Sequence, residues 1–142
     1  MKKLFLTAVV ALSTLAASAQ FMVVTTYDGD QEETMDMLTA NLGVGYEVSD
    51  AITVGAVRAL DANGDDSYEL FARYGLDMVG NGAYAMIQMP TEDMSDNMKI
   101  GVGMAINIWS SLYLEPNYTM PVSEDDNGDR EGSFNIGLGF RF

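Results

Sequence analysis

The stretch Gly132-Ser-Phe-Asn-Ile-Gly-Leu-Gly-Phe-Arg-Phe142 alternates between large apolar residues and small or polar residues. Side chains in a β-strand point to opposite faces with a period of two. The pattern therefore predicts a strand with one strongly apolar face and one face of small and polar side chains. Such a strand needs either a hydrophobic core or a lipid phase against its apolar face.

Residues 1–19 have the pattern of a secretory signal peptide. Lys2 and Lys3 precede an apolar run over residues 4–15, and the small-x-small sequence Ala17-Ser-Ala19 follows it. The apolar run is too short for a transmembrane helix of about 20 residues. We therefore expect residues 1–19 to be a cleaved signal peptide and residues 20–142 to form one exported domain.

The composition excludes several classes of function. The chain has 21 acidic and 7 basic residues, and loss of Lys2 and Lys3 would change the net charge from −14 to −16. A chain this acidic is not expected to bind nucleic acid, because phosphates require cations. The sequence contains no cysteine and no histidine, which removes disulfides and His-dependent catalytic triads. We expect no enzymatic activity, no cofactor and no bound metal.

The alternating pattern recurs along the chain in stretches of about 9–11 residues, the length of a tilted membrane strand. Clean alternation covers residues 38–48, 68–78, 98–108, 112–120 and 132–142. Three further stretches are rich in β-forming residues but leave the faces ambiguous, namely 21–27, 51–60 and 83–89. In the second, Arg58 shares the parity of the apolar residues, which indicates a rim position or a bulge. In the third, Gln88 indicates that Tyr84 and Met86 face inward with it.

The connections between these eight stretches alternate in character. Those at residues 28–36, 61–67, 90–97 and 121–131 are longer and polar, and they hold 16 of the 21 acidic residues. Those at residues 48–51, 79–82 and 109–111 are tight turns with suitable residues. An up-and-down meander places all longer loops at one end and all tight turns at the other. One rim of the molecule is therefore expected to be strongly negative.

A closed eight-stranded sheet presents its apolar face either outward to lipid or inward, as in a soluble lipocalin-like barrel. The polar face is rich in glycine, which weakens a water-exposed strand but makes room for larger side chains in a narrow lumen. Closure is required in lipid, because an open sheet edge leaves backbone groups unpaired. The sequence favours an all-β, eight-stranded antiparallel up-and-down transmembrane β-barrel, preceded by a cleaved signal peptide.

Two groups of residues are expected to matter in such a barrel. Inward charged residues should pair, since an unpaired buried charge is costly. This predicted lumen charge network comprises Glu47, Glu69, Arg73, Asp77, Lys99, Glu115 and Arg141. Aromatic residues near the strand ends match the girdles of membrane barrels. These predicted girdle residues are Tyr27, Tyr46, Tyr68, Trp109 and Tyr118.

Two acidic loops carry oxygen ligands at alternate positions, a pattern that suits Ca²⁺. They are Asp61-Ala-Asn-Gly-Asp-Asp66 and Glu124-Asp-Asp-Asn-Gly-Asp129. Neither has the glycine position or the final glutamate of the twelve-residue calcium loop. Asn-Gly turns at solvated hairpin tips are the favoured explanation of both loops. The alternative is weak bridging of these loops to neighbouring lipopolysaccharide by divalent cations.

The chain resembles the small OmpA/OmpX-type outer-membrane β-barrels. The resemblance is carried by Ala17-Ser-Ala19, by the repeated Leu42-Gly-Val-Gly-Tyr46 and Ile136-Gly-Leu-Gly-Phe140, and by the final Phe142. It implies that the outer-membrane assembly machinery reads the C-terminal strand. The residues of this implied assembly signal are Phe134, Ile136, Leu138, Phe140 and Phe142.

We therefore expect an integral, monomeric protein of a Gram-negative-type outer membrane, with acidic loops outside and both termini in the periplasm. Its expected partners are outer-membrane lipid, lipopolysaccharide and the assembly machinery. A structural or surface-interaction role is expected, because eight strands leave a lumen that side chains fill. Two alternatives stay open: a narrow porin-like channel for small solutes, and a soluble lipocalin-like ligand-binding barrel.

Overall fold

The computed structural model describes residues 20–27, 32–60, 63–92 and 97–142. The predicted signal peptide and parts of three predicted acidic loops lie outside the described residues. In the described part, the single helix is α2 (Thr34–Thr39), and no helix there is long and apolar enough to cross a membrane. The strands are β1 (Phe21–Thr26), β2 (Gly43–Glu47), β3 (Ile52–Leu60), β4 (Asp66–Gly75), β5 (Ala83–Pro90), β6 (Lys99–Met104), β7 (Ile106–Trp109), β8 (Leu112–Pro121) and β9 (Ser133–Arg141).

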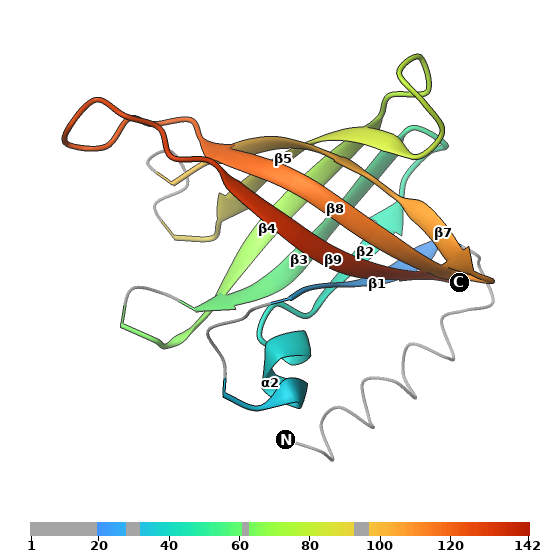
Figure 1. Ribbon diagram of the computed structural model, residues 1–142, viewed down its shortest axis with the longest axis horizontal. Coiled ribbons are helices and arrows are strands. Elements are labelled where there is room, and N and C mark those ends of the chain that lie inside the picture. Colours follow the sequence, from blue (N-terminus) through green and yellow to red (C-terminus); the bar gives the residue numbers. More distant parts are fainter. Residues whose placement is uncertain (1–19, 28–31, 61–62, 93–96) are drawn as a thin grey trace.

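The strands form one closed antiparallel sheet in which sequence neighbours pair, except β6 and β7, and β1 pairs with β9 (Figure 1). Both β6 and β7 pair with β8, through Val102 opposite Tyr118 and Ile106 opposite Leu114. They are therefore two halves of one barrel strand. The fold is an eight-stranded antiparallel up-and-down barrel, which confirms the fold class predicted for the barrel. Closure gives each of the eight barrel strands two hydrogen-bonded neighbours.

The meander gives the barrel two different ends. The connections β1–β2, β3–β4, β5–β6 and β8–β9 lie at one end, which we call the acidic-loop end. The connections β2–β3, β4–β5 and β7–β8 lie at the opposite end, which we call the turn end, together with the start of β1 and the end of β9. This arrangement places the predicted longer loops and the predicted tight turns on opposite rims, as the sequence indicated.

The start of the second barrel strand differs from the prediction. Alternation over residues 38–48 predicted a strand, but α2 covers the first part of this stretch and β2 begins at Gly43. The apolar residues Met35 and Leu38 are three positions apart, which also fits one face of a helix, and short apolar runs do not separate the two. The Thr25 hydroxyl donates a hydrogen bond to the Leu38 carbonyl, so α2 is attached beside β1, outside the ring of strands (Figure 1).

The sixth barrel strand is interrupted at Ala105, where the sequence predicted one continuous strand over residues 98–108. On the partner strand, Pro116 lies next to the break, and proline has no amide hydrogen to donate to the ladder. The alternation continues across the break, because Met104 and Ile106 are both exposed. The two faces of the strand are therefore the same before and after the interruption.

The structure also assigns the faces that the sequence left ambiguous. The register between β3 and β4 runs without a shift from Ile52 to Leu60, so Arg58 lies outward near the rim, where it forms an ion pair with Asp66 at 2.5 Å. In β5, Tyr84 is 5% exposed and points into the lumen, as Gln88 indicated. The rim position of Arg58 and the inward direction of Tyr84 are thus confirmed.

The outer surface carries large apolar side chains at the alternate positions that face away from the lumen. In β9, for example, Gly137 and Gly139 are buried, whereas Ile136 and Phe140 are exposed. We call these exposed residues the apolar belt: Val44, Tyr46, Ile52, Val54, Tyr68, Leu70, Tyr74, Ile100, Val102, Met104, Ile106, Ile108, Tyr118, Phe134, Ile136 and Phe140.

Candidate functional site

Glycines on the inward face make room for large side chains across the lumen. A Cβ added at Gly139 would lie 2.6 Å from Glu115 Oε1, and one added at Gly103 would lie 2.5 Å from the Tyr84 ring. The Phe71 ring lies against glycines of β2 and β3 in the same way. The inward glycines therefore have the space-making role that the sequence indicated.

We expect Gly139→Ala to lower the free energy of unfolding by about 1–3 kcal/mol, because the added methyl group overpacks the lumen against Glu115. Gly80→Ala is the matched control, since a Cβ at Gly80 meets no atom within 4 Å. Denaturant unfolding of the refolded protein measures both values. Equal stability of the two variants would show that the lumen has spare room at Gly139.

The half of the lumen nearer the turn end contains a three-residue ionic cluster that we call the lumen plug: Arg73, Glu115 and Arg141. Glu115 Oε2 lies 2.7 Å from an Arg73 guanidinium nitrogen, and Oε1 lies 3.7 Å from one of Arg141. The Glu115 side chain is 2% exposed. One buried carboxylate from β8 thus links two cations that come from β4 and β9.

Aromatic rings surround the lumen plug. The Arg73 guanidinium lies 4.6 Å from the Tyr84 ring centroid and 5.1 Å from that of Phe71. The Arg141 guanidinium lies 4.3 Å from the ring centroid of Tyr113. Such cation–π contacts stabilise guanidinium groups that have lost much of their water. Sequence reasoning did not assign Phe71 or Tyr113 to the site, although both are large aromatics on an inward face of small and charged residues.

Among the described residues, the predicted lumen charge network separates into the lumen plug, a second ion pair, and two residues that belong to neither. Glu69 forms a separate ion pair with Lys99 at 3.1 Å, nearer the acidic-loop end. Glu47 lies half-buried at the end of β2, and Asp77 is exposed in the turn between β4 and β5. Neither forms an ion pair with any described residue. Asp77 is not a lumen residue, because β4 ends at Gly75, before the alternation of the sequence reaches it.

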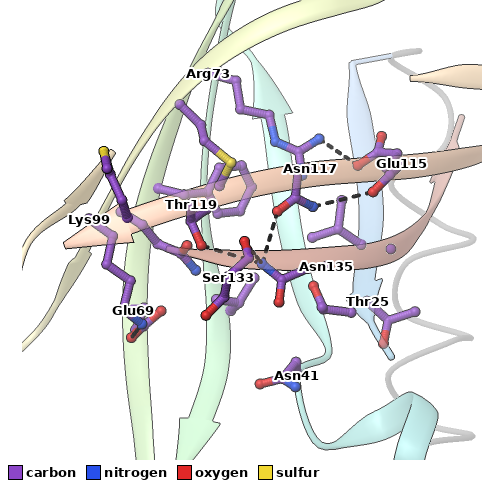
Figure 2. Close-up of a pocket in the computed structure, with 18 of the residues that line it drawn as sticks. Thr25, Asn41, Glu69, Arg73, Lys99, Glu115, Asn117, Thr119, Ser133 and Asn135 are labelled. Carbon is purple, nitrogen blue, oxygen red and sulfur yellow. Dashed lines mark hydrogen bonds and ion pairs between the residues drawn. The ribbon is translucent and has the colours of Figure 1, made fainter. Parts of the chain in front are cut away.

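The acidic-loop half of the lumen holds a cavity of about 370 Å³, which we call the vestibule (Figure 2). Its lining runs from the exposed Glu131 and from Lys99 at the acidic-loop end down to Arg73 and Glu115. Lumen residues at the turn end, such as Met22 and Arg141, are not part of this lining. The lumen plug therefore closes the vestibule on the side of the turn end.

One wall of the vestibule is a hydrogen-bonded group of polar side chains (Figure 2). The Asn135 amide donates to Asn117 Oδ1 and to the Thr119 hydroxyl, each at 3.3 Å. The Asn117 amide donates to the backbone carbonyl of Glu115 at 3.2 Å. Asn117 and Thr119 are each 8% exposed. Their position on the inward face of β8 was visible in the sequence, but their contacts depend on the pairing of β8 with β9.

In the acidic loop between β8 and β9, the Asp125 carboxylate accepts hydrogen bonds from the loop backbone. Asp125 Oδ1 accepts hydrogen bonds from the backbone amides of Asn127 and Asp129, each at 2.9 Å, and these bonds lower the pKa of the Asp125 carboxyl. Gly128 has a φ of +82°, as an Asn-Gly turn requires. This geometry is the hairpin tip that the sequence favoured over a calcium loop. The corresponding residues Asp61 and Ala62 lie outside the described residues.

The residues predicted for girdles and for assembly lie mainly on the outer surface. All five predicted girdle residues are exposed, from 38% for Tyr46 to 77% for Trp109. In the C-terminal strand, every second residue from Phe134 points outward, and the rings of Phe140 and Phe142 are in contact at 5.0 Å between centroids. The geometry therefore places both groups where lipid or another protein can reach them.

The site thus combines a lumen of paired charges, a polar pocket above the lumen plug, and an apolar exterior. No family model, curated protein or solved structure matches this chain. The described residues contain no group of three or more acidic side chains that could hold a metal ion.

Proposed function

We propose that the protein is an integral outer-membrane β-barrel with a structural or surface-interaction role and a lumen closed by side chains. The observation that carries this proposal is the apolar belt on the outside of a closed sheet. Soluble monomers rarely expose contiguous apolar patches larger than a few hundred Å². In a bilayer, the same belt faces hydrocarbon while the closed sheet satisfies the backbone hydrogen bonds.

The polar lumen supports the same proposal. Glu115, Asn117 and Thr119 are buried inside the barrel, whereas Val102 and Ile108 are more than half exposed outside it. A lipocalin-like soluble barrel needs the reverse, an apolar interior and a polar exterior. The exposed aromatics Tyr68 and Trp109 lie near opposite ends of the strands, which are the interface positions of membrane barrels.

The proposed environment assigns partners to the surfaces. The apolar belt would contact membrane lipid, and the acidic loops would face the cell exterior beside lipopolysaccharide. The outward face of β9, which ends in Phe140 and Phe142, would be read by the assembly machinery after export and removal of residues 1–19. The barrel would act as a monomer, because closure leaves it no sheet edge to share.

Localisation tests this proposal directly. Expressed with its own N-terminus in a Gram-negative host, the protein should fractionate with the outer membrane and resist extraction by carbonate. On gels, the unheated sample should migrate differently from the boiled sample, because a lipid-stable barrel stays folded in detergent. Recovery in the soluble periplasmic fraction would instead favour the lipocalin-like alternative.

Conductance separates a closed barrel from a narrow channel. Because the ion pair of Arg73 with Glu115 closes the vestibule below, the purified protein should be almost silent in planar lipid bilayers. Frequent, uniform openings of the unmodified protein would favour the porin-like alternative. The variant Glu115→Gln keeps nearly the same side-chain volume, so it tests whether charge pairing or steric filling closes the lumen.

A further inference from the structure

The vestibule has two chemically different walls that face each other across the barrel. The strands β8 and β9 contribute the amides of Asn117 and Asn135 and the hydroxyl of Thr119. Four positions around the ring, β3 and β4 contribute Val57 and Phe71. A ligand in this pocket therefore meets amide and hydroxyl groups on one side, and on the other side the carbon surfaces of Val57 and Phe71 beside the charged residues of β4.

The floor of the vestibule is the buried ion pair of Arg73 with Glu115. Glu115 Oε1 lies beside Arg141 and Gly139, neither of which lines the vestibule, so a solute meets hydrogen-bonding groups mainly on the polar wall. A hydroxyl group donates and accepts at the same time, so a hydroxylated solute suits a wall of amide and hydroxyl groups. Water has the same capacity and is the competing occupant.

The charges of the vestibule disfavour anions. Both cations in the lining are paired with a carboxylate, Lys99 with Glu69 and Arg73 with Glu115. The remaining carboxylate, Glu131, lies exposed at the mouth, next to the acidic loop between β8 and β9. A negatively charged solute would meet an unfavourable potential on entry.

We propose that the vestibule is a binding site for a small polyhydroxylated solute of about monosaccharide size that carries no negative charge. Its volume of about 370 Å³ lies within the roughly 300–1,000 Å³ of typical small-molecule pockets. Hydroxyl groups bind the amide and hydroxyl wall, and the C–H face of the solute packs against Phe71 and Val57. The solute enters and leaves at the acidic-loop end without crossing the barrel. This site goes beyond the proposed function, which assigns no ligand.

A titration of the refolded mature protein in detergent tests this inference, using three sugars that differ in charge. The side-chain amide NMR signals of Asn117 and Asn135 should shift saturably with glucose, which is neutral, and with glucosamine, which is a cation. Glucuronate, an anion of similar size, should bind at least about tenfold more weakly, corresponding to about 1.4 kcal/mol.

Variants locate the binding to the polar wall. Asn135→Leu removes the amide and should weaken glucose binding at least fivefold, whereas Asn81→Leu, in an exposed turn at the opposite end of the barrel, should leave it unchanged. Asn135→Asp keeps the side-chain shape and adds a negative charge. It should increase the preference for glucosamine over glucose, and it keeps the test decisive if the leucine variant does not fold.

Three outcomes would overturn the proposal. Absence of a saturable shift with both glucose and glucosamine would mean that the vestibule holds only water. Equal affinity for glucuronate would remove the charge argument. Unchanged affinity in both Asn135 variants would place the binding outside the vestibule. None of these outcomes depends on where the protein lies in the cell, so they are distinct from a failure of the localisation experiment.

Discussion

Leu70→Arg is expected to lower the free energy of unfolding by about 2–4 kcal/mol in lipid bilayers, the cost of a cation near the midplane on the lipid face of a barrel. Leu70 lies at the middle of β4 on the outer face and is 39% exposed. In water, a charged residue at such a position changes stability by only about 0.5 kcal/mol or less. The size of the loss therefore reports whether the apolar belt faces lipid.

The measurement is reversible unfolding in urea with liposomes present, followed by the fluorescence of Trp109, the single tryptophan of the chain. Val79→Arg is the matched control, because Val79 is also an exposed aliphatic residue, 77% accessible, but lies in the turn between β4 and β5. Near the interface, the cost of arginine falls to about 0–1 kcal/mol. If Leu70→Arg were as stable as Val79→Arg, the membrane proposal would lose its main support.

Glu115→Gln is expected to lower the free energy of unfolding by about 3–5 kcal/mol, the usual cost of removing one partner from a buried ion pair. The variant leaves the Arg73 guanidinium, whose side chain is 11% exposed, without its carboxylate. It also removes the longer contact to Arg141. Because one carboxylate pairs with two cations, this single change should cost more than the loss of either arginine.

The matched control for Glu115→Gln is Glu124→Gln, which breaks the exposed ion pair with Arg130. Exposed ion pairs contribute about 0–1 kcal/mol, so this control should be almost neutral. Arg73→Met should destabilise more than Arg141→Met, since Arg141 is 32% exposed and its contact is 3.7 Å long. Adding Arg73→Met to Glu115→Gln should recover part of the loss. Equal effects of the two glutamate changes would mean that the lumen is solvated well enough to screen the plug.

The lumen plug and the vestibule occupy different halves of the same lumen. The plug, built on Glu115, ties β4, β8 and β9 together across the barrel. Above it, the smaller polar side chains of Asn117 and Asn135 leave the space that forms the vestibule. Inward-facing residues thus form both the closed plug and the open vestibule. The plug is closed because its side chains are large, and the vestibule is open because its polar side chains are smaller.

The sequence by itself determined the meander, most of the strands and the facing of the strands that alternate cleanly. The strands β8 and β9 lie within one residue of the predicted stretches 112–120 and 132–142. A period of two is a local property, so it can be read without knowing any neighbour. The same local character explains the failure near Leu38, where a short apolar run fits helix and strand equally and the contact of α2 with β1 is not encoded in the run.

Only the tertiary structure decided which inward residues meet. Arg73 and Glu115 are 42 positions apart in the sequence, and parity alone assigns both to the lumen without stating their height or partner. Their contact depends on barrel closure and on the stagger of β4 against β8. Asp77 lies outside the lumen because β4 ends before it. The vestibule depends on which inward side chains lie at the same position along the barrel axis. Alternation determines whether each residue faces the lumen or the outside. Its position along the barrel axis is set by the register of all eight strands together.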